Sequence, residues 1–141
     1  MSEIQNYRDL EARQVGMKVL LLAYDATNRF PPSERFGLTA QLRRAAVSLP
    51  SNVAEGQVWN SPGVFLRHIR IALGSLAELD TQLEAAIRLS YVSIKAVVDL
   101  QNTMQSSRRL LYGLRRAQRR RLGLSVAGTS ILVMLAVQLL S

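Results

Sequence analysis

The residues with catalytic or metal-binding chemistry are few and scattered in this sequence. His68 is the single histidine and there is no cysteine, which excludes a Cys/His zinc site and a disulfide framework. No phosphate-cradling glycine loop or nucleophile motif is present. Several carboxylates lie in helical segments, where they are most simply ion-pair partners of arginines: Glu55, Glu78, Asp80 and Glu84. We therefore expect no catalytic residue, no metal and no cofactor, and predict that the protein is not an enzyme.

Arginine is the residue type whose spacing indicates a function. The chain has 18 Lys and Arg against 10 Asp and Glu, a net charge of +8. Seven arginines follow Asp99, and no acidic residue does. The guanidinium group pairs with phosphate through a flat, bidentate fork. At 100° per residue, six of these arginines form two adjacent columns on a helix: Arg108, Arg115 and Arg119 in one, and Arg109, Arg116 and Arg120 in the other.

These two arginine columns are predicted to lie on one outward face, opposite the apolar Met104, Leu111 and Leu114. A face of this kind, without acidic residues, would give a positive field suited to an RNA or DNA backbone. No RNA-recognition module or aromatic stacking platform is visible, so binding is expected to depend on charge and shape. Further candidate nucleic-acid-binding residues are Arg43, Arg44, Arg67 and Arg70.

Four predicted helices would position the arginines. The third begins after Ser61-Pro62, a good N-cap with proline at the first helical position. It has apolar residues at heptad spacing: Phe65, Ile69, Ala72, Leu76, Leu79, Leu83 and Ala86. The fourth begins after Ser93 and has similar spacing: Val97, Leu100, Met104, Leu111 and Leu114. Because the links are short, we predict an all-α fold, an antiparallel up-down four-helix bundle.

The first two helices have less regular patterns. The first, about residues 4–29, has two apolar stripes and so should need neighbours on two sides. One stripe is Leu10, Met17, Leu21 and Tyr24, and the other is Ala12, Val15, Val19, Leu22 and Ala26. In the second helix, about residues 33–56, Pro50 predicts a kink or break near residues 48–51.

The last twenty residues, Leu122 to Ser141, carry no charge. A helix of that length spans about 30 Å, the thickness of the hydrocarbon core of a bilayer. The arginine run from Arg115 to Arg121 precedes it, as in a positive-inside flank. We therefore divide the chain into a bundle domain, 1–121, and an apolar C-terminal helix, 122–141, predicted to be a transmembrane tail anchor from Leu122 to Leu140. The small residues Gly123 and Ala127 have the spacing that lets such helices approach closely.

The opening segment MSEIQNYRDLEARQ bears on localisation. It is polar and lacks the apolar core of a secretory signal. We therefore expect the bundle at the cytoplasmic face of a bacterial inner membrane. The alternative is a soluble cytoplasmic protein whose tail is buried inside an oligomer.

Three segments carry a resemblance to a known family. They are YRDLEARQVGMKVLLLAYDATNRF, FPPSERFGLTAQLRRAAVSLPSNVAEG and FLRHIRIALGSLAELDTQLEAAIRL. Together they resemble the bacterial four-helix bundle proteins, also called 23S rRNA intervening-sequence proteins, over about residues 5–118. Family members usually continue the AEG motif with basic residues and a serine, whereas this chain has Gln57 to Pro62. The family pattern ends near Arg119, before the apolar tail.

The resemblance implies further expectations. It implies a left-handed bundle that assembles as a homopentameric ring, with no known catalytic activity and a presumed nucleic-acid-binding role. The family is similar in fold to accessory proteins of diversity-generating retroelements, which makes a reverse transcriptase or another nucleoprotein a candidate partner. The sequence therefore predicts an oligomeric RNA-binding protein tethered to a membrane. The alternatives are a membrane-acting oligomer whose clustered tails form a pore, and a soluble scaffold with a buried tail.

Overall fold

The computed structural model describes residues 7–123 and 126–141. Within these ranges the chain forms five α-helices and no strand: α1 (Tyr7–Thr27), α2 (Leu38–Val58), α3 (Pro62–Arg88), α4 (Val98–Arg121) and α5 (Val126–Leu140). The prediction of an all-α fold is confirmed. Two short 3-10 turns, η1 (Pro32–Glu34) and η2 (Lys95–Val97), precede α2 and α4. Residues 4–6 of the predicted first helix lie outside the described residues.

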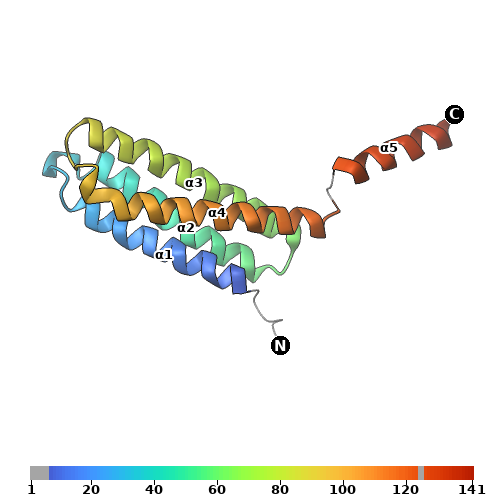
Figure 1. The fold of residues 1–141 in the computed structure, drawn as a ribbon, viewed down its shortest axis with the longest axis horizontal. Helices are drawn as coiled ribbons and strands as arrows, with labels where there is room; N and C mark the ends of the chain where they lie inside the picture. Colours follow the sequence, from blue (N-terminus) through green and yellow to red (C-terminus); the bar gives the residue numbers. More distant parts are fainter. Residues whose placement is uncertain (1–6, 124–125) are drawn as a thin grey trace.

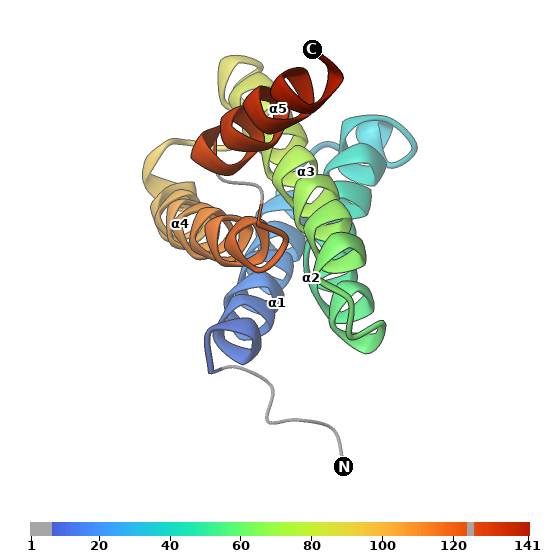
Figure 2. The ribbon, with the colours of Figure 1, turned by 90° about the vertical axis from the view of Figure 1, so that its right-hand side faces the viewer.

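Helices α1 to α4 lie side by side, and successive helices run in opposite directions (Figure 1). Helix α1 packs against α2 and α4, and α3 packs against the same two helices. The four helices therefore stand at the corners of a square around one core. Figure 2 looks onto the end of the bundle where α3 begins and α4 ends.

The core of the bundle follows the heptad patterns of α3 and α4. All seven predicted seam residues of α3, from Phe65 to Ala86, are buried, as are all five of the fourth helical segment, from Val97 to Leu114. The start of α3 is also as predicted, because the Val64 N–H donates to Ser61 Oγ and Pro62 is the first helical residue. At the next link, Ser93 Oγ accepts from the Ala96 N–H within η2, whereas the N-cap position of α4 is Val97; the predicted cap at Ser93 is therefore not the cap of α4.

Helix α2 is continuous through Pro50. Of the predicted kink or break, the break is therefore wrong, and the kink stays a prediction. Proline lacks an N–H and removes one helical hydrogen bond. Close packing against α1 accompanies this defect: a Cβ placed on Gly16 would lie 3.3 Å from both Cα and Cβ of Pro50. One turn of α2 is further tied by the Asn52 amide, which donates to the Ser48 carbonyl at 2.8 Å. Tertiary packing therefore holds a helix that local sequence preferences would interrupt.

Helices α2 and α3 lie close together at Gly56. A Cβ on this residue would lie 2.7 Å from Cδ2 of Phe65 and 2.9 Å from Cβ of His68. Such distances are far shorter than van der Waals contact. The glycine of the AEG segment therefore has a packing role, because it lets the end of α2 lie directly on the start of α3.

The C-terminal apolar helix is shorter than predicted. Helix α4 ends at Arg121, and Gly123 adopts a left-handed conformation with φ of 66°, which favours glycine and ends the helix. Helix α5 has 15 residues and a length of about 22 Å; its described side chains, from Leu132 onward, are exposed. Because Gly123 lies outside α5, the predicted Gly123–Ala127 motif is not on one helix. No helix among the described residues combines the length and hydropathy needed to cross a membrane.

The contact at Gly56 generates the first prediction. Gly56→Ala should lower the free energy of unfolding by about 1–3 kcal/mol, because the added methyl group overpacks the α2–α3 contact. Gly74→Ala is the matched control, since nothing lies within 4 Å of a Cβ at this position. It should raise stability by up to about 1 kcal/mol through helix propensity. Urea denaturation of both variants tests this, and equal effects of the two substitutions would contradict the packing role of Gly56.

Candidate nucleic-acid interface

The two predicted arginine columns of α4 lie on different parts of its surface. Arg108 forms an ion pair with Asp80 of α3, which places the first column at the seam between α3 and α4. The neighbouring column is exposed at all three of its positions: Arg109, Arg116 and Arg120. The predicted outward position is therefore confirmed for the second column. In the first column, Arg108 and Arg115 are half-buried.

The Arg108–Asp80 ion pair corrects one expectation and fixes the register of two helices. The arginine face was expected to lack acidic neighbours, but Asp80 is supplied by the adjacent helix and offsets the charge of Arg108. Because α3 and α4 are antiparallel, the residue ten positions before Asp80 in α3 lies level with the residue ten positions after Arg108 in α4. Arg70 is thus level with Gln118, beside Arg119.

Toward the end of the bundle where α3 begins and α4 ends, the charged residues of both helices are all positive. No acidic residue occurs in α3 from Pro62 to Ala77 or in α4 from Leu110 to Arg121. The arginines in this region are exposed except for the half-buried Arg115, and no described carboxylate lies within salt-bridge distance of them. We call them the basic end: Arg67, Arg70, Arg115, Arg116, Arg119 and Arg120.

Arg115 is positioned by an aromatic ring. Its guanidinium carbon lies 4.6 Å from the centroid of the Tyr112 ring, a cation–π contact worth about 0.5–1 kcal/mol at an exposed site. The partner was missed in the sequence, although residues three apart are neighbours on a helix surface. Tyr112 is thus a supporting residue of the basic end.

Arg43 and Arg44 lie near the opposite end of the bundle. Arg43 Nε donates to Thr27 Oγ1 at 2.8 Å, and its Nη2 donates to Asn28 Oδ1 at 3.1 Å. The same guanidinium lies over the Tyr24 ring. Arg43 therefore joins the end of α1 to the start of α2, while Arg44 is exposed. The ten predicted arginines do not form a single surface.

Arg121 is set apart from the basic end by Asp9 on α1. Burial raises the pKa of the Asp9 carboxyl, and the nearby positive charge of Arg121 partly opposes this shift. One oxygen of Asp9, Oδ1, is buried without a hydrogen-bond partner among the described residues. The attraction between these two side chains places Arg121 toward α1 and away from the α3–α4 seam.

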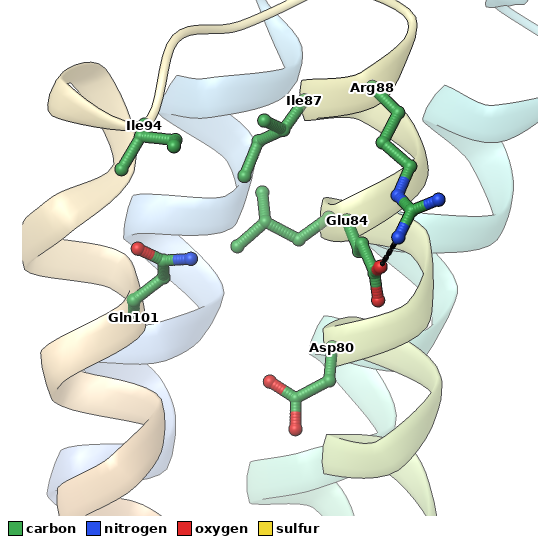
Figure 3. A pocket seen from close by; sticks show the side chains of 7 residues that line it. Asp80, Glu84, Ile87, Arg88, Ile94 and Gln101 are labelled. Carbon is green, nitrogen blue, oxygen red and sulfur yellow. Dashed lines mark ion pairs between the residues drawn. The ribbon is translucent and has the colours of Figure 1, made fainter.

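A groove between α3 and α4 contains the acidic part of this surface (Figure 3). Both of its carboxylates have arginine partners: Glu84 pairs with Arg88 at 2.7 Å and Asp80 pairs with Arg108. The other lining residues are mostly apolar, at Leu83, Ile87 and Ile94. Both carboxylates of the groove are therefore engaged in ion pairs with arginines.

His68 belongs to a polar chain between α2 and α3. Its Nδ1 lies 3.0 Å from Oδ1 of Asn52 and 4.0 Å from a carboxylate oxygen of Glu55. The Asn52 amide donates to Ser48 Oγ, and the Ser75 hydroxyl donates to the same oxygen at 2.8 Å. These contacts give His68 and Glu55 a structural role in joining two helices. No three potential metal ligands come together in the described part of the chain.

Fold and surface together define a small helical bundle protein with a cluster of six arginines at one end of α3 and α4. The chain belongs to the 23S rRNA-intervening sequence protein family, whose model matches residues 8–113. No curated protein matches the chain significantly. The family match covers nearly all of α1, all of α2 and α3 and most of α4. It stops before Arg115, so all four α4 residues of the basic end lie beyond it.

Proposed function

We propose that this protein is a non-enzymatic, homo-oligomeric RNA-binding protein that contacts the phosphate backbone through its basic end. The observation that carries the proposal is the grouping of six arginines from two helices in a region without acidic residues. Arginine is the side chain best suited to bidentate phosphate contacts. The name of the family refers to ribosomal RNA, which favours RNA over DNA as the polyanion.

The arrangement of the arginines supports recognition of charge rather than sequence. Arg115 and Arg119 are one helical turn apart, about 6 Å along α4, and so are Arg116 and Arg120. Arg67 and Arg70 extend the same positive region onto α3. Contacts to phosphate position a protein on nucleic acid and carry no sequence information by themselves. An oligomer would repeat the basic end and increase the positive field at the RNA.

The RNA proposal predicts a strong and local salt dependence. Arg115, Arg116, Arg119 and Arg120 should together be replaced by glutamine in the full chain. Affinity for a labelled single-stranded RNA should fall at least roughly tenfold, and the slope of log K against log salt should decrease in magnitude by about 3. Fluorescence anisotropy across a salt series measures both quantities.

A control variant of equal charge sharpens this test. Replacing Arg29, Arg35, Arg44 and Arg88 by glutamine removes the same formal charge from the rest of the surface. This variant should retain most of the affinity, because these residues lie away from the basic end. Equal losses in both variants would contradict a localised site and indicate a response to net charge alone.

We further propose that α5 tethers the protein to a membrane. Leu132, Val133, Met134, Leu135, Val137, Leu139 and Leu140 are all exposed large apolar side chains. Exposure of these side chains to water is unfavourable, because burying one aliphatic side chain of this size stabilises the protein by about 1.5–3 kcal/mol. Arg121, which lies outside the basic end, precedes α5 and would contribute about 1 kcal/mol near anionic lipid headgroups. The basic end would remain available to RNA.

The tether proposal predicts a specific failure of membrane retention. Val133→Arg, in the middle of α5, should release the full chain from membranes on alkaline washing, because one arginine there costs about 2.5–3.5 kcal/mol. Leu89→Arg is the control, since Leu89 is an exposed apolar residue of the bundle and should not affect retention. Complete extraction of the unmodified chain would contradict the tether.

A further inference from the structure

Trp59 is an exposed aromatic residue at the end of the bundle that carries the basic end. It is the single tryptophan of the chain, and it directly follows α2, in the turn to α3. This turn lies at the same end of the bundle as the end of α4 (Figure 1). The exposed fraction of Trp59 is 63%, and that of the neighbouring Val58 is 80%. An exposed indole beside a positive surface offers a large, rigid contact area to a ligand.

The backbone on both sides of Trp59 is held in place. Before it, Gly56 packs the end of α2 directly onto α3. After it, Asn60 adopts a left-handed conformation with φ of 46°, and its N–H donates to the Gln57 carbonyl at 3.4 Å. Ser61 then caps α3. Because the turn is short and fixed at both ends, little conformational freedom would be lost when a ligand packs on the indole.

The positive surface of the basic end extends across α3 toward this turn. At 100° per residue, Arg70 lies about 80° round α3 from Asp80, which pairs with α4, and Arg67 lies about 140° round in the same direction. Both arginines are exposed. Arg67 is also only about 8 Å along the helix axis from Pro62, the first residue of α3. A strand that follows the arginines from α4 across α3 therefore reaches the turn that carries Trp59.

The charge around the turn favours a nucleobase as the ligand of Trp59. The acidic residue nearest to it in the sequence is Glu55, whose carboxylate lies 4.0 Å from His68 Nδ1. A purely apolar partner that covered both the indole and the arginines would desolvate positive charges without supplying counter-charges. Single-stranded RNA supplies phosphates for the arginines and flat bases for the indole. Stacking of one base on an aromatic side chain contributes about 1–3 kcal/mol and tolerates any sequence.

We propose that Trp59 stacks on an unpaired base of the RNA whose phosphates the basic end contacts. The inference rests on the RNA binding of the proposed function and adds a preference for unpaired over paired RNA, because the bases of a duplex are already stacked on one another. The sequence predicted no aromatic stacking platform. A single indole is one stacking surface, and its position beside the arginines depends on the fold.

Because the chain has one tryptophan, its indole fluorescence reports on Trp59 alone. Fluorescence of the full chain and anisotropy of end-labelled RNA should be measured with an oligouridine, an abasic strand of equal length and an RNA duplex. The oligouridine should bind and quench the fluorescence, whereas the two control RNAs should bind without comparable quenching. Binding of the oligouridine without quenching, or equal quenching by either control RNA, would overturn the stacking proposal and leave the basic end as the RNA surface. Absence of binding by all three RNAs would overturn both proposals.

Substitution of Trp59 separates stacking from charge. Trp59→Ala in the full chain should weaken oligouridine binding about five- to a hundredfold and leave the slope of log K against log salt unchanged, because no charge is removed. Trp59→Phe should retain most of the affinity, since an aromatic ring remains. Phe36→Ala is the matched control and should not change the affinity, because Phe36 is 85% exposed beside Arg35 near the opposite end of the bundle. Equal losses for Trp59→Ala and Phe36→Ala, or no loss for Trp59→Ala, would overturn the proposal.

Vesicles of phosphatidylglycerol provide the control for a membrane contact, because tryptophan is also common at membrane interfaces. The emission of Trp59 should be quenched by oligouridine and should keep its wavelength when the vesicles are added. A blue shift on the vesicles, without quenching by oligouridine, would overturn the proposal and assign the turn to the lipid surface.

Discussion

The close contact between α2 and α3 is the constraint on which the other features of the bundle depend. Gly56 lets the end of α2 lie against Phe65 and His68 without a clash. The polar chain from Ser75 through Ser48 and Asn52 to His68 ties the same two helices along their length. This contact fixes the rotation of α3 about its axis. The heptad seam consequently points inward, Asp80 points toward α4, and Arg67 and Arg70 remain exposed.

The distribution of charge on the α3–α4 surface follows from this rotation of α3. In the acidic part of α3, two carboxylates have arginine partners, in the pairs Asp80–Arg108 and Glu84–Arg88. Where α3 has only arginines, α4 also has only arginines, and the positive charge accumulates. Arginine therefore has two separate roles in one small protein. Arg43 and Arg108 join helices to one another, whereas the basic end has no described acidic partner and is the surface proposed for RNA.

Much of the fold could be predicted from the sequence, because heptad spacing encodes burial directly. Every apolar seam residue of α3 and α4 is buried as predicted. The continuity of α2 through Pro50 could not be predicted, since it depends on the approach of α1 at Gly16, a contact distant in sequence. The start of the apolar C-terminal helix was predicted too early, because the composition from Leu122 onward is uniformly uncharged. The left-handed conformation of Gly123, which ends α4, could not be predicted from that composition.

The candidate site was less predictable, because it also depends on contacts between residues that are distant in sequence. Helical geometry alone places Arg109, Arg116 and Arg120 in one column, and the structure leaves all three exposed. The pairing of Arg108 with Asp80 depends on the register between two helices, which no local pattern specifies. The bond from Arg43 to Thr27 likewise joins residues on either side of a turn. Sequence reasoning therefore identified the arginines but could not separate those that bind RNA in our proposal from those that hold the fold.

The central claim is that the basic end of α3 and α4 is the surface that contacts RNA. Hydroxyl-radical footprinting of the full chain, with and without single-stranded RNA, tests it with two native reporters. Tyr112 lies under Arg115 in the basic end, and Tyr24 lies under Arg43 near the opposite end of the bundle. The account predicts that Tyr112 becomes protected when RNA is added and that Tyr24 does not change. Protection of Tyr24 by RNA, with no change at Tyr112, would contradict the account.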